Sequence, residues 1–131
     1  MKLAVVGSRN FPKLELVEQL IHALKPETEV LSGGARGVDL TAEKAARKRG
    51  LKLRVFYPAW QSQGKSAGPK RNKLLVAEAD GLIAFWDGKS TGTFNAIQEA
   101  ASRHIWLRVV YPNGQWVQCY DIKGVFIQDL K

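Results

Sequence analysis

Four stretches of the sequence carry glycine, hydroxyl, amide or basic side chains, and two of the four are glycine-rich turns that lead into helices, which is the composition of phosphate-binding loops. Backbone N–H groups at the start of a helix attract anions because that end carries a partial positive charge, and arginine adds two parallel hydrogen bonds. The sequence therefore predicts a ligand that carries phosphate. The candidate ligand-binding residues are Gly7, Ser8, Arg9, Asn10, Gly33, Gly34, Ala35, Gly37, Asp39, Arg71, Asn72, Trp86, Ser90, Thr91, Gly92 and Thr93.

The same stretches contain few groups suited to acid–base catalysis. Asp39 and Asp87 are their only acids, and no serine–histidine–aspartate set, cysteine–histidine pair or carboxylate pair is expected there. The glycine spacing matches neither the dinucleotide fingerprint nor the P-loop. We therefore expect a binding site that requires no cofactor and no metal, in which Asp39 or Asn72 contacts a ribose hydroxyl; catalytic residues are not assigned.

Strands alternate with helices along the chain, and this alternation determines where the four stretches lie. We expect strands at 2–6, 29–31, 51–56, 81–85 and 105–110, helices at 14–24, 38–49, 69–79 and 93–103, and a polar loop at 57–68. Such strand–helix–strand units form a mostly parallel sheet with helices on both faces. The predicted fold class is α/β, a Rossmann-like three-layer sandwich, whose ligand site lies beyond the carboxyl ends of the strands.

Residues 111–131 change this rhythm. After a turn at 111–114, the segments 115–120 and 125–127 are expected to form a β-hairpin that adds antiparallel strands at one edge of the sheet. We therefore expect one domain over residues 1–131, with an α/β core at 1–110 and a hairpin extension at 111–131. The hairpin either covers its own sheet edge or pairs with a second subunit in a homodimer, and the sequence leaves both open.

Cysteine content and hydropathy indicate the compartment. Cys119 is the only cysteine, which excludes an internal disulfide and a cysteine-rich zinc site and is typical of a reducing compartment. The sequence contains no apolar run of membrane-spanning length and no recognisable signal peptide. We expect a cytoplasmic protein with no membrane partner.

The charge favours anionic partners and supports a second hypothesis. The chain has 20 basic and 12 acidic residues, a net charge of +8 and a pI near 9.8, which attracts polyanions over long range. A cluster of cations around the end of the second helix is either a solvated surface or a nucleic-acid-binding patch. This basic patch consists of Lys44, Arg47, Lys48, Arg49, Lys52 and Arg54.

The order of the motifs adds a family resemblance. Val-Val-Gly-Ser-Arg at 5–9, Ser-Gly-Gly-Ala-Arg-Gly-Val-Asp at 32–39, Gly-Pro-Lys-Arg-Asn at 68–72 and the run from Asp80 to Thr93 resemble the SLOG superfamily. That superfamily groups the DNA-processing protein A (Smf) proteins with the LOG phosphoribohydrolases, and this chain most resembles its small stand-alone YspA-like branch. Over residues 3–103 the resemblance implies a Rossmann-like fold that binds nucleotides or nucleotide-derived ligands.

Three functions follow from the residues and the resemblance together. The first is binding of a nucleotide or a nucleotide-derived, NAD-related ligand, by a sensor, a sequestering protein or a weak hydrolase. The second is binding of single-stranded or duplex DNA, as the resemblance to DNA-processing protein A implies. The third is phosphoribohydrolase activity of the LOG kind. The resemblance places Ala96 at the position of the LOG catalytic glutamate, with Glu99 one turn later, and this difference counts against the third function.

Overall fold

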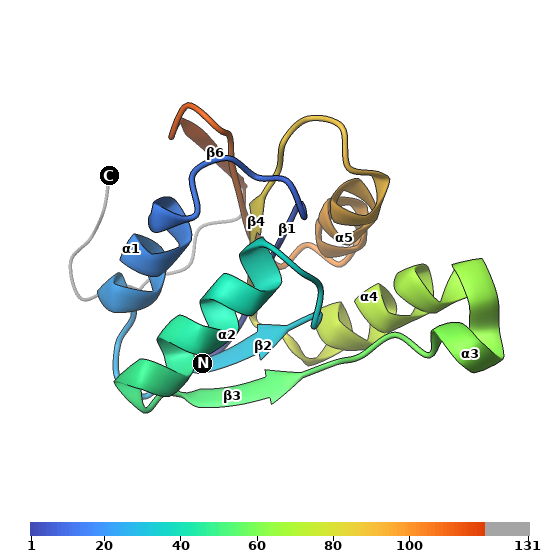
Figure 1. Ribbon diagram of the computed structural model, residues 1–131, viewed down its shortest axis with the longest axis horizontal. Helices are drawn as coiled ribbons and strands as arrows, with labels where there is room; N and C mark the ends of the chain where they lie inside the picture. Colours follow the sequence, from blue (N-terminus) through green and yellow to red (C-terminus); the bar gives the residue numbers. More distant parts are fainter. Residues whose placement is uncertain (120–131) are drawn as a thin grey trace.

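The computed structural model describes residues 1–119, which build a six-stranded sheet in the order β3-β2-β1-β4-β5-β6 (Figure 1). Strands β1 to β5 are parallel, and β6 is antiparallel to β5. The strands span Lys2–Gly7 (β1), Glu29–Ser32 (β2), Lys52–Val55 (β3), Gly81–Phe85 (β4), Trp106–Val110 (β5) and Trp116–Cys119 (β6). This confirms the predicted α/β class and the antiparallel edge strand; the segment 125–127 lies outside the described residues.

Helices cover both faces of the sheet (Figure 1). Helices α1 (Glu15–Ala23) and α2 (Val38–Arg49) lie on one face, and α4 (Ala67–Glu78) and α5 (Thr91–Ser102) on the other. A short helix α3 (Trp60–Gln63) and a 3-10 turn η1 (Gly64–Ser66) precede α4. Among the described residues, no helix has the length and hydrophobicity needed to cross a bilayer.

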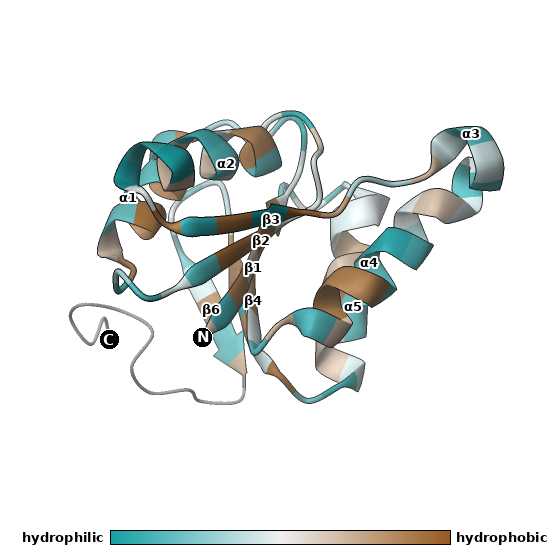
Figure 2. Cartoon of the chain, turned by 90° about the horizontal axis from the view of Figure 1, so that it is seen from below, coloured by the Kyte–Doolittle hydropathy of each residue, from teal (hydrophilic) through white to brown (hydrophobic). Residues whose placement is uncertain are grey.

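The central strands are buried on both faces, and this explains the two layers of helices. In β1, Leu3 and Val5 pack into the core beneath α1 and α2, whereas Ala4 and Val6 pack into the core beneath α4 and α5. Figure 2 shows these strands in hydrophobic colours between the two helical layers. Parallel strands require this double cover because both faces of a parallel sheet are normally buried.

The largest departure from the sequence-based prediction lies at 57–68. The sequence indicates a polar loop there, but the structure has α3 and η1 in this segment, and α4 begins at Ala67 rather than at residue 69. Pro69 therefore occupies the third position of α4 instead of the first, which is tolerated because N–H groups in the first turn have no helical acceptor. As a result, this segment contributes Trp60 and Lys65 to a cleft at the edge of the sheet.

Candidate functional site

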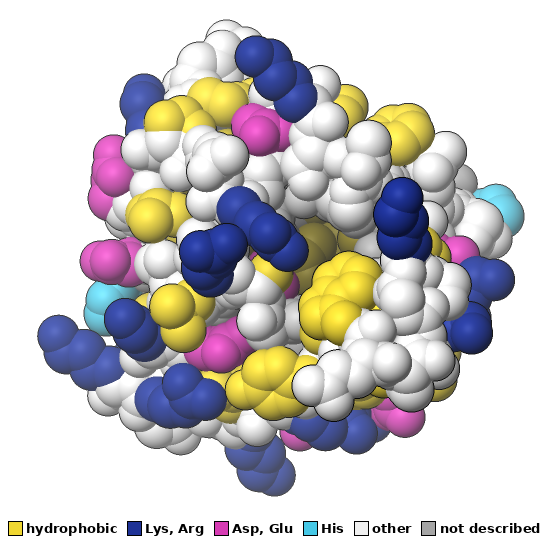
Figure 3. All heavy atoms as spheres, turned by 45° about the vertical axis from the view of Figure 1, so that its right-hand side comes forward, with side chains coloured by type: hydrophobic (Ala, Val, Ile, Leu, Met, Phe, Trp, Pro, Cys, Tyr) yellow, Lys and Arg dark blue, Asp and Glu magenta, His cyan; other side chains and the backbone are white. Residues whose placement is uncertain are grey.

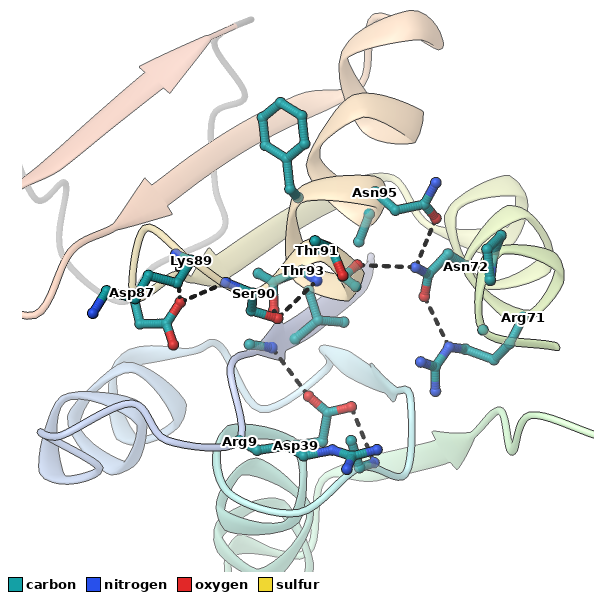
Figure 4. Close-up of a pocket in the computed structure, with 18 of the residues that line it drawn as sticks. Arg9, Asp39, Arg71, Asn72, Asp87, Lys89, Ser90, Thr91, Thr93 and Asn95 are labelled. Carbon is teal, nitrogen blue, oxygen red and sulfur yellow. Dashed lines mark hydrogen bonds between the residues drawn. The ribbon is translucent and has the colours of Figure 1, made fainter. Parts of the chain in front are cut away.

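A cleft of about 900 Å³ opens where the strand order reverses, beyond the carboxyl ends of β1 and β4. This is the position at which ligands bind in open α/β sheets, and the volume is within the range of about 300–1,000 Å³ found for ligand pockets. Figure 4 shows Arg71 and Asn72 reaching in from α4, Lys89 and Ser90 on the opposite side, and Arg9 and Asp39 below. The space-filling view in Figure 3 shows lysine and arginine side chains around a hollow in one face of the molecule.

Asp39 forms the base of the cleft and joins the first two loops. Its Oδ1 accepts the N–H of Gly7 at 3.1 Å and its Oδ2 accepts the N–H of Ala35 at 3.2 Å, and the residue is 3% exposed. Burial raises the pKa of Asp39 from 3.8 to about 7, although these two N–H groups and the charge of Arg71 act in the opposite direction. Near neutral pH, therefore, this carboxyl group holds a proton in a large fraction of molecules.

Arg71 lies beside Asp39 because Gly33, between them, has no side chain. A Cβ on Gly33 would lie 2.7 Å from both Nη1 of Arg71 and Oδ2 of Asp39. The Arg71 guanidinium donates to the Gly33 carbonyl oxygen and, through Nε, to Oδ1 of Asn72 at 2.8 Å. Burial lowers the pKa of Arg71 from its usual value, the charge of Asp39 opposes this shift, and the positive charge of Arg9 adds a smaller lowering. Two arginines that disfavour each other's charge in this way are stabilised by an anion between them.

Asn72 is a positioning residue. The residue is 3% exposed, and its Nδ2 donates to the carbonyl oxygen of Gly92 at 3.2 Å and to Oδ1 of Asn95 at 2.9 Å. Because its Oδ1 accepts from Arg71, the side chain ties the cleft end of α4 to the first turn of α5. These bonds fix Arg71 relative to the loop that begins α5.

The loop between β4 and α5 presents free N–H groups to the cleft. Ser90 caps α5 by accepting the N–H of Thr93 at 3.3 Å, whereas Thr91 and Gly92, as the first two helical residues, have no acceptor within the helix. Both residues line the cleft. Burial alone would raise the pKa of Asp87, but hydrogen bonds from Ser90 and Lys89 outweigh it and the pKa is below the usual value. Ionised Asp87 therefore holds the loop that presents these N–H groups.

Two aromatic side chains form apolar parts of the cleft wall. Trp60 is 50% exposed and Phe94 is 43% exposed, and both line the cleft. Trp86, predicted as a ligand contact, instead lies outside the lining, stacks on Phe94 with ring centroids 5.5 Å apart and donates its Nε1–H to the Ser90 carbonyl oxygen at 3.0 Å. Trp86 thus supports Phe94, and Phe94 and Trp60 are the aromatic rings in the cleft lining.

The structure brings most of the predicted ligand-binding residues to this cleft. Those in its lining are Gly7, Arg9, Asn10, Ala35, Asp39, Arg71, Asn72, Ser90, Thr91, Gly92 and Thr93. The remaining predicted residues lie outside the lining: Ser8, Gly33, Gly34, Gly37 and Trp86. Ser8, for example, is 1% exposed and accepts the N–H of Asp87 at 3.2 Å, so it holds two loops together.

Several residues of the cleft lining were not predicted from the sequence. Lys65 and Lys89 add charge, and Asn95 and Gln98 add amides along α5. The two amides could have been predicted from the sequence, because residues 91, 95 and 98 are spaced so that they lie on one face of a helix. Ala96 lines the cleft at the position of the LOG glutamate, whereas Glu99 is outside the lining and pairs with Arg103 at 3.9 Å.

The predicted basic patch is only partly free. Arg49 donates to the carbonyl oxygens of Ile21 and Leu24 at 2.6 and 2.9 Å, and so caps the end of α1. Arg54 pairs with Glu78 at 3.4 Å and lies over the ring of Phe56. The remaining members, Lys44, Arg47, Lys48 and Lys52, are at least partly exposed. They lie toward the opposite end of α2 from Asp39, away from the cleft.

Asp39 is expected to make the fold less stable as the pH rises. Its pKa is about 7 in the folded protein, against 3.8 for an aspartate in water, which represents the unfolded chain. Its stabilising effect is therefore complete below the unfolded value and is lost as the pH rises to the folded value. The free energy of unfolding should fall by about 4 kcal/mol over this interval on account of Asp39 alone. Urea unfolding at a series of pH values, compared with Asp39→Asn, isolates this effect, because asparagine does not titrate. Parallel pH profiles for the two proteins would contradict the prediction.

Comparisons with known proteins agree with the sequence resemblance. The model of the family described as "YspA, cpYpsA-related SLOG family" matches residues 1–62. DNA processing protein DprA of Streptococcus pneumoniae is 42% identical over 67 residues, which cover 44% of this chain and 24% of that protein.

Solved structures share the fold. The X-ray structure of DNA processing protein A from Streptococcus pneumoniae matches with a TM-score of 0.73 and 23% identity, over 83% of this chain and 50% of that chain. The structure describing the single-stranded DNA binding mode of DNA processing protein A from Helicobacter pylori matches with a TM-score of 0.65 and 22% identity, over 84% of this chain and 65% of that one. The chain thus spans about half the length of the first of these structures.

Proposed function

We propose that the cleft of this chain, whose first 62 residues match the model of a SLOG family, binds a nucleotide or a nucleotide-derived ligand by the phosphate. The observation that supports this most strongly is the convergence of Arg9, Arg71 and the free N–H groups of Thr91 and Gly92 on one cleft. Lys65 and Lys89 line the same cleft. These four cations face two acids, Asp39 and Asp87, and the raised pKa of Asp39 reduces its opposition to an anion.

The rest of the cleft suits the other parts of a nucleotide. Trp60 and Phe94 each present an exposed aromatic surface on which a base can stack. Asn95 and Gln98 supply amide donors and acceptors for base edges or hydroxyls. We therefore place the phosphate at the start of α5 and the nucleoside along the wall that contains these residues.

The direct test is calorimetric titration with 5′-mononucleotides and nicotinamide dinucleotides, together with thermal shift. A ligand at a hundredfold excess over its dissociation constant stabilises the fold by about 2.7 kcal/mol, which is easily detected. We expect one ligand class to bind with one site per chain. Absence of both heat and thermal shift with every nucleotide would refute the proposal.

Replacing Gly92 by alanine should weaken nucleotide binding without harming the fold. A Cβ at Gly92 meets no protein atom within 4 Å, and alanine in a helix is more stable than glycine by about 1 kcal/mol. The added methyl group would nevertheless stand beside the N–H groups proposed to bind phosphate. We expect the melting temperature to stay equal or rise while the dissociation constant increases about tenfold or more. Unchanged affinity in a folded Gly92→Ala variant would place the phosphate elsewhere.

DNA binding is the second candidate function, and the similarity to DNA processing protein DprA favours it. The exposed part of the basic patch, Lys44, Arg47, Lys48 and Lys52, provides a surface for a phosphate backbone. If the patch binds DNA, affinity for a single strand should fall steeply with salt, and a Lys44→Ala/Lys48→Ala variant should reduce that dependence by about two phosphate contacts. If DNA binds only through the cleft, this variant should bind as the wild type does and Arg71 variants should fail.

A further inference from the structure

A second groove adjoins the cleft and shares Arg71 with it. This groove, of about 440 Å³, lies between the segment after β3 and the outer side of α4. Six of its lining residues are Tyr57, Pro58, Lys70, Arg71, Lys73 and Leu74. Because Arg71 also lines the cleft, the two hollows adjoin at this residue.

The chemistry of the groove is that of a nucleotide subsite. Tyr57 is 70% exposed and its ring packs over Gly34, where a Cβ would lie 2.7 Å from Cδ1 of the ring. The ring thus rests against the backbone at Gly34, while much of its surface remains open for stacking. Leu74, which is 64% exposed, adds an apolar surface.

The charges in the groove are of one sign. Lys70 and Lys73 are exposed, and neither forms an ion pair within the described part of the chain. None of the described residues that line the groove is acidic. Aromatic surface beside unopposed cations is the combination that binds successive nucleotides of a single strand, by base stacking and phosphate attraction.

We propose that the groove of Tyr57, Lys70 and Lys73 is a second nucleotide subsite, so that the ligand has at least two linked nucleotide units and spans Arg71. This inference rests on the proposed function of the cleft and specifies the size of its ligand. The two units are part either of a free dinucleotide or of the end of a longer strand, and both have the same phosphate and base chemistry.

The test compares three probes on the purified chain by calorimetry: thymidine monophosphate, thymidine 3′,5′-bisphosphate and the dinucleotide pTpT. The bisphosphate has two phosphate groups, as pTpT has, and at least as much negative charge, but it lacks the second nucleoside, so a gain from charge alone would appear with both probes. We expect pTpT to bind about tenfold or more tightly than either mononucleotide, which corresponds to stacking of one base. Equal binding of pTpT and the bisphosphate would overturn the subsite.

Variants of the groove residues show whether the tighter binding of pTpT arises in the groove. Tyr57→Ala and Lys70→Ala/Lys73→Ala should each remove the advantage of pTpT and leave the affinity for thymidine monophosphate within about threefold of wild type. Tyr57→Phe, which keeps the aromatic face, should retain the advantage. The charge-matched control Lys13→Ala/Lys25→Ala changes two lysines outside both linings and should behave as wild type. Groove variants that weaken every probe equally would overturn the proposal.

The outcomes separate this inference from the proposed function. Binding of thymidine monophosphate without any gain for pTpT refutes the subsite alone, whereas no binding of any probe refutes the nucleotide function and the subsite with it. Titration with a single strand of about twelve nucleotides distinguishes a free dinucleotide from the end of a longer strand as the ligand. Much tighter binding than pTpT indicates the end of a strand, and affinity equal to that of pTpT indicates a free dinucleotide.

Discussion

Replacing Arg71 by methionine should weaken nucleotide binding about a hundredfold or more, the largest loss expected from any single change in the cleft. Its guanidinium is positioned by the Gly33 carbonyl oxygen and by Asn72, so it meets an anion in a fixed orientation. Methionine retains most of the apolar stem and removes both the charge and the donors. Calorimetric titration with the nucleotide that binds wild type best measures the loss.

Two further variants show whether the loss of affinity arises from the planar arrangement of the guanidinium donors or from the positive charge alone. Arg71→Lys keeps a positive charge without the planar pair of donors, and we expect it to recover only part of the affinity, to about tenfold below wild type. Arg103→Met removes an equal charge at the far end of α5, where Arg103 pairs with Glu99, and should leave affinity unchanged. A similar loss in Arg103→Met would mean that overall charge, rather than the cleft, determines affinity.

Stability must be measured alongside affinity in Arg71→Met. The Gly33 carbonyl oxygen loses its donor, which costs about 1–2 kcal/mol, and Asp39 loses the neighbouring charge that favours its ionised form. The pKa of Asp39 should therefore rise further, and the pH profile of stability should move to higher pH with it. A variant that remains folded at the titration temperature and still fails to bind assigns the loss to the ligand contact.

The fold could be predicted from the sequence because its strongest signals are local. The run from Lys2 to Gly7 is apolar and ends in a glycine, and the structure makes it the central strand β1, paired with β2 and β4. Helix α2 begins and ends as predicted, because Gly50 at φ 72° supplies the left-handed residue that ends a helix. Once strands and helices alternate, topology brings the loops to one edge, so much of the cleft lining followed from the order of elements alone.

The missed parts of the site depend on contacts that no local pattern encodes. The segment 57–68 has no strong helix start signal, yet its fold places Trp60 and Lys65 in the cleft lining. The protonation of Asp39 depends on burial beneath loops that are distant in the sequence. Trp86 was predicted to contact the ligand from its place in a loop, and only the three-dimensional structure shows that Phe94 lies against it.

Gly37→Ala should destabilise the fold by at least ~3 kcal/mol, a large part of the ~5–15 kcal/mol that typical domains have. Gly37 precedes α2 with φ 77° and ψ −118°, a conformation that residues with a side chain rarely adopt. A Cβ at this position would also collide with the carbonyl group of Arg9. Urea unfolding at constant pH measures the loss.

The control is Gly50→Ala, which separates backbone strain from collision. Gly50 also has a positive φ of 72°, but a Cβ there meets nothing within 4 Å, so only the cost of the left-handed conformation applies, about 1–2 kcal/mol. A loss at Gly37 no larger than that at Gly50 would show that the Arg9 loop moves aside easily. A much larger loss would mean that close contact between the first two loops is part of the fold, and that Arg9 is held at the cleft before any ligand arrives. Gly37 would then be a glycine required by the fold, in contrast to Gly92, where only a bound ligand would oppose a side chain.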